Sequence, residues 1–291
     1  MVLRMVVLAV TSMATISLGA LYFYQRSIIY PSTLNSARSG TDSPSKYNLP
    51  FEEIYLTTPD KVKLHSYFLK HSNQIIENKF RKTIVILSPN AGNIGHFLPV
   101  VNYIFNLGHN VFIYQYRGYG QSTGEPTEDG LKIDAETAMD YLINDKTIKN
   151  SPLILYGRSL GGAITLFIAN KFGFLQNDRK LGFIIENTFL DIPRVVPHIF
   201  PLLGWLGENI LSKLISDRWW SEIEIVKIRD DIPGLFLSGT LDEVVPPLHM
   251  KKLFDLKKGL KVWREFQSHH NDTIVQDGYW DTWEQFVDSY V

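Results

Sequence analysis

The chain has 291 residues and a formal net charge of −1, and 45% of its residues are hydrophobic while 20% are charged. This composition is typical of a folded globular protein with a large core, and it excludes a disordered chain. The basic residues form no concentrated run, which excludes nucleic acid as a partner. Because the sequence contains no cysteine, disulfides, thiolate nucleophiles and cysteine-ligated metal sites are excluded as well.

The amino-terminal segment differs from the rest of the chain. Residues 5–24 carry no formal charge and lie between Arg4 and Arg26, and three aromatic residues end the stretch at 22–24. A helix needs about 20 apolar residues to cross a bilayer, and aromatic rings favour its interface. We therefore expect a single-pass transmembrane signal anchor over residues 1–29. A cleaved signal peptide would have a shorter apolar region, and a buried helix would show a polar face.

Residues 30–50 contain scattered Ser, Asn, Gly and Pro and are expected to form a polar tether after the anchor. The charges around the span give a weak orientation signal. Arg4 precedes the span, whereas Arg26, Arg38 and Lys46 follow it. By the positive-inside rule, this count favours a cytoplasmic catalytic domain.

From residue 51 onward, short apolar or β-branched runs predict eight strands. The runs lie at 53–57, 62–69, 83–87, 110–114, 153–156, 181–185, 234–237 and 262–266. Helical segments are expected at 129–144, 161–172, 247–256 and 280–290. The first two strands suit an antiparallel hairpin, whereas the later runs suit burial on both faces. The order predicts an α/β domain over 51–291, with an eight-stranded, mostly parallel sheet and helices on both faces.

One interval between predicted strands is too long for a simple connection. Residues 187–231 contain Pro193, Pro197 and Pro201 and many large apolar residues, including three tryptophans at 205, 219 and 220. We expect this interval to form a helical cap inserted into the α/β domain.

A glycine-rich turn follows the strand predicted at 153–156. Residues 157–161 read Gly-Arg-Ser-Leu-Gly, and a helical pattern begins directly afterwards. The G-x-S-x-G pattern places a serine on a tight strand-to-helix turn, where neighbouring side chains would collide and glycines are needed. The following helix directs amide groups and its positive dipole end toward the serine. This context predicts Ser159 as a nucleophile.

A nucleophilic serine needs a histidine as general base and a carboxylate that orients the histidine. Asp242 follows the strand predicted at 234–237, and His270 follows the strand predicted at 262–266, so the order Ser, Asp, His is satisfied. From chemistry alone, Glu243 could replace Asp242 and His269 could replace His270. Glu186, which ends the strand before the cap, is another possible acid.

Acyl transfer also needs backbone amides that stabilise the developing oxyanion. Leu160 directly follows the serine and is expected to supply one amide. The second is expected from the loop after the strand at 83–87, with Asn90 as the donor, because Pro89 has no amide hydrogen. This loop is rich in glycine but lacks the G-x-x-x-x-G-K-[ST] arrangement of a nucleotide-binding loop.

Several runs of residues together resemble the membrane-anchored α/β-hydrolase subfamily that includes the fungal bud-emergence proteins and animal abhydrolase-domain relatives, which are serine aminopeptidase-like. The runs are Asn90-Ala91-Gly92-Asn93-Ile94-Gly95-His96, Tyr116-Arg117-Gly118-Tyr119-Gly120-Gln121-Ser122-Thr123-Gly124, Gly157-Arg158-Ser159-Leu160-Gly161-Gly162, Glu186-Asn187-Thr188-Phe189 and His270-Asn271-Asp272-Thr273. The resemblance covers residue 51 to the end, together with the anchor.

The resemblance implies an α/β-hydrolase fold and favours Asp242 over Glu243 and His270 over His269. It also implies a type II topology with a lumenal or extracellular domain, in the endomembrane system or vacuole, in contrast to the charge count. The sequence departs from the family pattern at residues 88–89, where Ser-Pro replaces the usual His-Gly pair. The run Asn271-Asp272-Thr273 matches a glycosylation sequon, but its place beside the predicted base favours an active-site loop.

These observations predict a serine hydrolase that cleaves an ester, a thioester or an amide through an acyl-enzyme. As an esterase, lipase or acyl-protein thioesterase, it would act on an acyl-lipid or acylated protein near a membrane. The expected partners are this acyl substrate and the lipid bilayer, and the mechanism requires no metal or organic cofactor. Two alternatives stay open, because a fold does not fix a reaction. One is an inactive membrane-tethered binding or scaffold protein, and the other is perhydrolysis or carbon–carbon bond hydrolysis.

Overall fold

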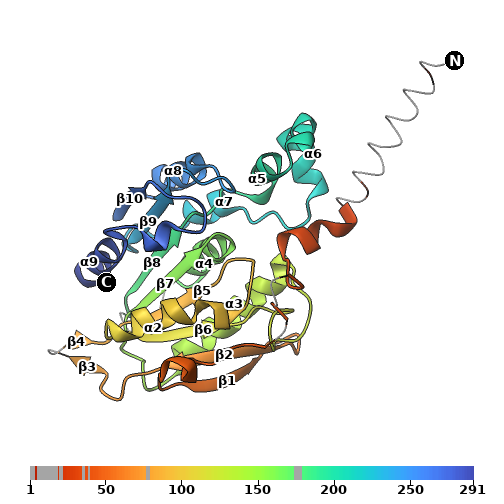
Figure 1. The fold of residues 1–291 in the computed structure, drawn as a ribbon. Coiled ribbons are helices and arrows are strands. Elements are labelled where there is room, and N and C mark those ends of the chain that lie inside the picture. The colour runs from red at the N-terminus through yellow and green to blue at the C-terminus, as the bar shows by residue number, and fades with distance from the viewer. Residues whose placement is uncertain are drawn as a thin grey trace.

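The computed structural model describes residues 22–34, 37–38, 40–76, 79–173 and 179–291, together with Arg4 and Gly19. An eight-stranded sheet with the order β1-β2-β6-β5-β7-β8-β9-β10 lies at its centre (Figure 1). The pairs β1–β2 and β2–β6 are antiparallel, and all other neighbours in this sheet are parallel. This is the α/β-hydrolase fold that the sequence predicts.

All eight predicted strands are confirmed, with ends shifted by no more than two residues. They are β1 (Glu52–Thr57), β2 (Lys63–Leu69), β5 (Thr83–Leu87), β6 (Asn110–Tyr114), β7 (Leu153–Arg158), β8 (Leu181–Glu186), β9 (Gly234–Gly239) and β10 (Lys261–Phe266). A separate small hairpin consists of β3 (Ile75–Ile76) and β4 (Lys79–Phe80).

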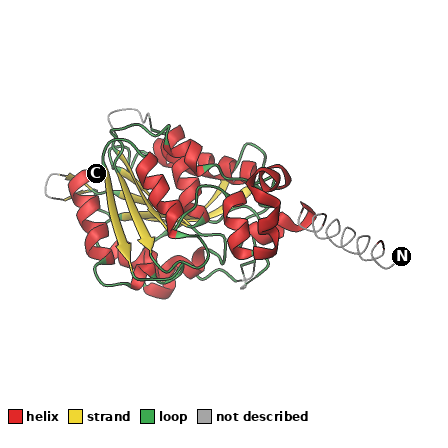
Figure 2. Ribbon diagram, turned by 90° about the horizontal axis from the view of Figure 1, so that it is seen from above, coloured by secondary structure: helices red, strands yellow, loops and turns green. Residues whose placement is uncertain are grey.

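Helices cover both faces of the sheet (Figure 2). From residue 40 onward and outside the cap interval, the described helices are α2 (Leu98–Asn106), α3 (Glu128–Asn144), α4 (Leu160–Lys171), α8 (Pro247–Leu256) and α9 (Tyr279–Tyr290), and the short 3-10 helices are η1 (Pro44–Tyr47), η2 (Ile94–Phe97) and η4 (Thr273–Val275). Helices α3, α4 and α8 contribute to one buried cluster, and α2 and α9 contribute to the other. Strand β7 shows why the two clusters form: Leu153 and Leu155 face the first, and Ile154 and Tyr156 face the second.

Helix α2 was not expected from the sequence, whereas the other four helices were. Its nine residues form a short and mostly apolar run. Periodicity alone does not distinguish such a run from a buried strand, because too few turns are present to show a polar face.

The long interval between β8 and β9 holds four helical elements. They are α5 (Ile192–Ile199), η3 (Pro201–Leu206), α6 (Gly207–Leu214) and α7 (Ser221–Ile225). Val196, Leu206, Leu211 and Ile215 form a small buried cluster of their own, separate from the two clusters beside the sheet. The predicted helical cap is therefore present, with its own small core.

The predicted membrane span lies largely outside the described residues. Of residues 5–24, the structure describes Gly19 and residues 22–24, and residues 22–29 are helical. Within the described part of the chain, none of the helices is both long enough and apolar enough to cross a bilayer.

The range expected to form a tether packs against the α/β domain where it is described. Tyr30, Ala37 and Leu49 are buried, and η1 begins at Pro44. These apolar side chains are scattered among polar ones and show no periodicity, so the sequence pattern gave no sign of their burial.

Candidate active site

Ser159 occupies the sharp turn between β7 and α4. Its backbone has φ 54° and ψ −120°, a conformation that is costly for a residue with a side chain. A Cβ atom at Gly157 would collide with Gly161 and Thr165, and one at Gly161 would collide with the Leu87 carbonyl. The two glycines therefore allow β7, α4 and β5 to approach closely enough to hold the serine in this strained turn.

The structure brings together the three residues predicted as nucleophile, base and acid. His270 Nε2 lies 3.2 Å from Ser159 Oγ, and His270 Nδ1 lies 2.7 Å from Asp242 Oδ2. The second Asp242 oxygen, Oδ1, accepts hydrogen bonds from the backbone N–H groups of Val244 (2.9 Å) and Val245 (2.8 Å). All three side chains are largely buried, and each follows the carboxyl end of a parallel strand. This arrangement can pass the serine proton to the imidazole and stabilise the resulting charge.

The alternative acid and base pair with each other at the surface, and Glu243 Oε2 also accepts a hydrogen bond from the His270 backbone amide at 3.3 Å. His269 Nδ1 lies 3.1 Å from Glu243 Oε2, and both side chains are more than half exposed. Neither side chain contacts Ser159 in the described structure. The geometry therefore favours Asp242 and His270 over their neighbours in the sequence.

Glu186, the third possible acid, belongs to a buried network on another side of the turn. Its Oε2 atom accepts hydrogen bonds from the hydroxyls of Tyr156 (2.9 Å) and Tyr279 (2.6 Å). Burial raises the pKa of both tyrosine hydroxyls well above the usual value for tyrosine. Both hydroxyls therefore stay protonated and can donate. The Glu186 carbonyl also accepts from the Ser159 amide at 2.9 Å. Glu186 thus supports the serine turn and does not orient the histidine.

Asn187 links the loops that carry Asp242 and His270. Its Nδ2 donates to the His270 carbonyl (3.2 Å) and to Thr273 Oγ1 (2.8 Å), and its Oδ1 accepts from the Gly239 amide (2.7 Å). Its backbone has φ 46°, a left-handed conformation that asparagine tolerates better than most residues. The motif Glu-Asn-Thr-Phe appears in the sequence resemblance, but the bracing role of Asn187 depends on contacts between distant loops and was missed.

The two predicted oxyanion donors line the same cavity as Ser159. Leu160 begins α4, and Asn90 lies in the loop after β5. This loop is held by two tyrosines: the Tyr116 hydroxyl donates to the Ser88 carbonyl (2.7 Å), and the Tyr119 hydroxyl donates to the Asn90 carbonyl (2.8 Å). The Tyr-Arg-Gly-Tyr run therefore fixes the backbone at the Ser-Pro departure from the family pattern.

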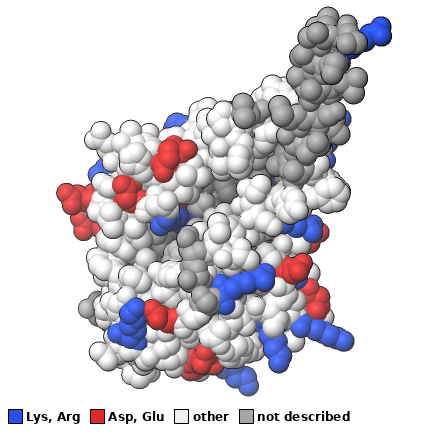
Figure 3. Space-filling view, turned by 45° about the vertical axis from the view of Figure 1, so that its right-hand side comes forward, with Lys and Arg blue, Asp and Glu red and all other residues white. Residues whose placement is uncertain are grey.

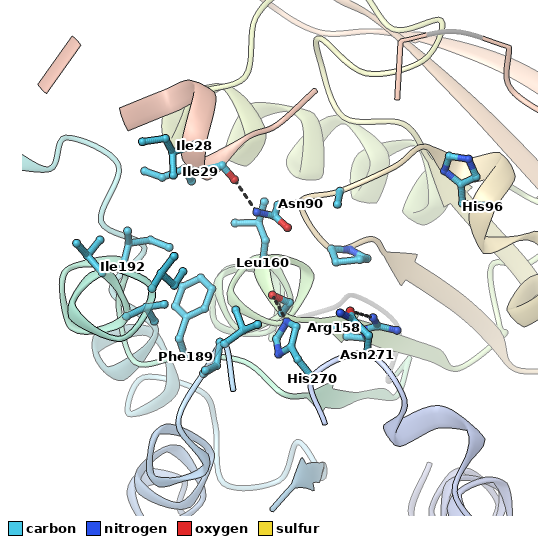
Figure 4. Close-up of a pocket in the computed structure, with 18 of the residues that line it drawn as sticks. Ile28, Ile29, Asn90, His96, Arg158, Leu160, Phe189, Ile192, His270 and Asn271 are labelled. Carbon is cyan, nitrogen blue, oxygen red and sulfur yellow. Dashed lines mark hydrogen bonds between the residues drawn. The ribbon is translucent and has the colours of Figure 1, made fainter. Parts of the chain in front are cut away.

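A cavity of about 500 Å³ opens above Ser159 (Figure 4). We call Ser159, Asp242, His270 and their loops the polar floor. One side of the cavity is lined by apolar residues, which we call the apolar wall: Ile28, Ile29, Ile192, Val195, Val196, Ile199 and Phe200. Arg158 also lines the cavity and donates to Asn271 Oδ1 at 2.5 Å, which places the sequon asparagine at the site.

Ile28 and Ile29 were not predicted to line the site. They lie at the end of the predicted anchor, in the helical segment at residues 22–29, and the Asn90 Nδ2 group donates to the Ile29 carbonyl at 2.9 Å (Figure 4). The apolar pattern that predicts a membrane anchor does not indicate a contact with a loop that lies far away in the sequence. Among the described residues, no group of three or more His, Asp or Glu side chains is placed to hold a metal ion.

Comparisons with known proteins identify relatives over nearly the whole chain. The family model described as "Serine aminopeptidase, S33" matches residues 78–221. The "Uncharacterized membrane protein YNL320W" of Saccharomyces cerevisiae is 42% identical over 95% of this chain and 93% of its own length. "Protein bem46" of Schizosaccharomyces pombe is 39% identical, covering 96% and 91%. The "Alpha/beta hydrolase domain-containing protein WAV2" of Arabidopsis thaliana is 34% identical, covering 92% and 88%.

Solved structures share the fold at low sequence identity. An α/β hydrolase from Vibrio vulnificus has a TM-score of 0.68 at 18% identity, covering 91% of this chain and 90% of its own. The esterase Pf2001 from Pyrococcus furiosus has a TM-score of 0.66 at 16% identity, covering 86% and 93%. Together with the close relatives, these likenesses agree with the sheet order and the strand-end site. The chain belongs to the α/β-hydrolase family, in the group that contains bem46 and WAV2.

Proposed function

We propose that this protein is a serine hydrolase that cleaves carboxylic esters or thioesters through an acyl-enzyme on Ser159. The observation that carries the proposal is the position of His270, which lies between Ser159 Oγ and Asp242 at the floor of an apolar cavity. Fixed hydrogen bonds to both imidazole nitrogens define the tautomer that a general base requires.

The reaction follows from this geometry. Ser159 Oγ bonds to the substrate carbonyl carbon while its proton moves to His270 Nε2, and Asp242 stabilises the charged imidazole. The backbone N–H groups of Leu160 and Asn90 stabilise the oxyanion. His270 then returns the proton to the leaving alkoxide or thiolate as its bond to carbon breaks. Water, activated by the same histidine, hydrolyses the acyl-serine ester and restores the enzyme.

The cavity lining favours an apolar acyl group over a peptide amino terminus. Asp242 lies behind His270 and does not line the cavity, none of the described lining residues is acidic, and the apolar wall consists of Ile, Val and Phe side chains. An aminopeptidase needs a group that binds the substrate ammonium, because a buried cation without a partner is costly. An acyl chain instead gains about 0.8 kcal/mol for each buried CH₂ group.

The natural substrate is then an acyl-lipid or an acylated protein at a membrane. Residues 5–24 supply a stretch long enough for a single-pass anchor, and the relative in Saccharomyces cerevisiae is named a membrane protein. A type II orientation, with the hydrolase domain on the lumenal side, follows the resemblance to the anchored subfamily. The anchor would hold the site close to substrates that partition into the bilayer.

Labelling with a fluorophosphonate probe tests the proposal, because this reagent reacts with an activated serine. We expect wild type to be labelled and Ser159→Ala to be unlabelled. Ser268→Ala is the matched control, since Ser268 is buried nearby but its Oγ contacts Thr273 and not the base. Labelling of Ser159→Ala, or no labelling of folded wild type, would contradict the proposal. The second outcome would instead favour a non-catalytic binding protein on this fold.

A further inference from the structure

The mouth of the cavity is rimmed by apolar side chains that are also exposed. Ile28, Ile199 and Phe200 all line the cavity, and their exposed fractions are 44%, 47% and 36%. Side chains that face both the cavity and solvent mark the edge of its opening. The substrate therefore enters between the segment after the predicted span and the end of α5.

The segment after the span is tied to the cap by polar contacts. Gln25 Oε1 accepts from the Ser216 amide at 2.7 Å, and Arg26 forms an ion pair with Asp217 at 3.5 Å. The Trp219 indole N–H donates to the buried Tyr30 hydroxyl at 2.9 Å. These contacts hold residues 25–30 against the cap, next to the mouth.

Apolar exposure continues from the mouth across the cap. Trp205 on η3 is 70% exposed and Ile210 on α6 is 47% exposed. We call Ile28, Ile199, Phe200, Trp205 and Ile210 the mouth surface. In Figure 1, the cap helices α5 and α6 lie beside the helical segment at residues 22–29, and in Figure 3 the described surface carries its charged side chains in separate groups with uncharged areas between them. Exposed apolar groups in such a cluster mark an interaction site.

We propose that the mouth surface docks onto the lipid bilayer, so that an acyl chain passes from the lipid phase into the cavity without crossing water. The occupant follows from the chain itself, because the predicted span ends at residue 24 and the contacts of Gln25 and Arg26 with the cap hold the cap next to that end. Tryptophan and phenylalanine side chains favour the membrane interface. The inference rests on the proposed anchor and acyl substrate.

A fluorescent probe tests docking without reference to hydrolysis. The chain has no cysteine, so Trp205→Cys in the full-length protein provides a unique site for an environment-sensitive nitrobenzoxadiazole label. Phe80→Cys is the matched control, because Phe80 is also exposed but lies on the β3–β4 hairpin, away from the cap. In phosphatidylcholine nanodiscs that contain doxyl-labelled lipid, we expect the probe at 205 to be quenched at least twofold more than the probe at 80.

Equal quenching at the two positions, or no quenching at 205, would overturn docking. Emission at 205 that changes with protein concentration and not with doxyl lipid would also overturn it, since a second copy would then cover the surface. Fluorophosphonate labelling of each variant verifies that the domain is folded.

Turnover links docking to the substrate. With an ester that is soluble in water, we expect Trp205→Glu to retain the wild-type kcat/KM. With a long-chain ester carried in phosphatidylcholine vesicles, we expect at least a fivefold loss, whereas Phe80→Glu retains activity toward both. A similar loss toward both esters, or no loss toward either, would overturn the inference while leaving the hydrolase assignment intact. If folded wild type hydrolyses neither ester, the proposed function itself fails.

Discussion

The polar floor and the apolar wall enclose one cavity but are held in place by different forces. On the floor, hydrogen bonds fix His270 from both ring nitrogens, fix Asp242 from two backbone amides and tie the loops through Asn187. The wall is held largely by contacts between apolar side chains, in which Ile29 and Ile192 pack against the small cap cluster. Hydrogen bonds define direction and distance narrowly, whereas apolar contacts tolerate changes of shape if volume is kept.

This difference separates two roles in the proposed enzyme. The reaction depends on distances of about 3 Å between reacting groups, so changes to the floor should affect turnover by orders of magnitude. Acyl-chain selectivity depends on the volume and polarity of the wall, where one methylene is worth about 1 kcal/mol. Substitutions on the two sides should therefore differ in both the size and the kind of their effects.

The largest effect is expected from Asp242→Asn. The substitution keeps the size of the side chain but removes the charge that stabilises the protonated His270, and it favours the wrong imidazole tautomer. We expect kcat for a soluble ester to fall about 10⁴-fold with little change in KM. Glu243→Gln is the matched control at an exposed carboxylate one residue later, and it should change kcat less than twofold because the glutamine oxygen can still accept from the His270 amide. A comparable loss in Glu243→Gln would mean that the surface pair takes part in the reaction.

A second large effect is expected on the stability of the fold at low pH. It depends on His249, a residue of α8 that contacts the cap interval. His249 Nδ1 accepts a hydrogen bond from the Leu190 amide at 3.2 Å. Burial lowers the pKa of His249 from 6.5 to about 4, and nearby positive charges contribute to the decrease. Those charges belong to His198, Arg194 and Lys252, and Asp242 acts in the opposite direction.

Because the folded-state pKa lies below the unfolded value, the unfolded chain binds more protons between pH 4 and 6.5. His249 therefore contributes stability that is complete above pH 6.5 and is lost as pH falls toward 4. The free energy of unfolding, measured with urea, should fall between pH 7 and pH 4.5 in both proteins. We expect this fall to be about 2 to 3 kcal/mol smaller in His249→Gln than in wild type. His269→Gln, at an exposed site, should keep the wild-type dependence.

The sequence was sufficient to predict the floor because its residues follow rules that act locally. Apolar runs indicate the buried strands, the glycines around Ser159 indicate the tight turn, and the order Ser, Asp, His places three side chains at strand ends. These local rules do not decide between Asp242 and Glu243, because both residues lie in one loop. It depends on which carboxylate receives the Val244 and Val245 amides, a detail of loop geometry.

The wall could not be predicted in the same way. The sequence indicated an inserted helical cap, but its lining residues depend on how α5 packs against Ile29, which is far away in the chain. The bracing contacts of Asn187 and Tyr119 likewise join segments that no local pattern relates. Apolar packing specifies a fold only when all partners are present, so single segments carry little information about it.

A smaller effect, on selectivity, is expected from Ile192→Phe. Ile192 lines the cavity and is partly buried, so a larger ring should occupy space that the distal part of an acyl chain would use. We expect the ratio of kcat/KM for a hexadecanoyl ester to that for an acetyl ester to fall about tenfold, a difference of about 1.4 kcal/mol. Ile223→Phe, at an exposed cap position outside the cavity lining, should leave the ratio unchanged. If kcat/KM fell equally for both esters, Ile192 would affect the reaction itself and not the selectivity for acyl-chain length.

The smallest effect is expected where the two sides meet, at Asn90. Its side chain contacts the Ile29 carbonyl on the wall, whereas its backbone N–H is the predicted oxyanion donor on the floor. Asn90→Ala removes the first contact and keeps the second, and the Tyr119 hydroxyl still holds the residue 90 carbonyl. Losing one such hydrogen bond costs about 1 kcal/mol, so kcat for a soluble ester should fall less than tenfold.

Asn106→Ala, at an exposed position on α2, is the control and should retain wild-type kcat. A loss of more than 100-fold in Asn90→Ala would indicate that the amide side chain itself contacts the oxyanion, because removal of one oxyanion donor costs about 10²- to 10³-fold in kcat. The division between a floor that performs the reaction and a wall that selects the substrate would then not hold at this residue. A loss of kcat below tenfold would instead mean that the Asn90 side chain belongs to the wall and that only its backbone contributes to the reaction.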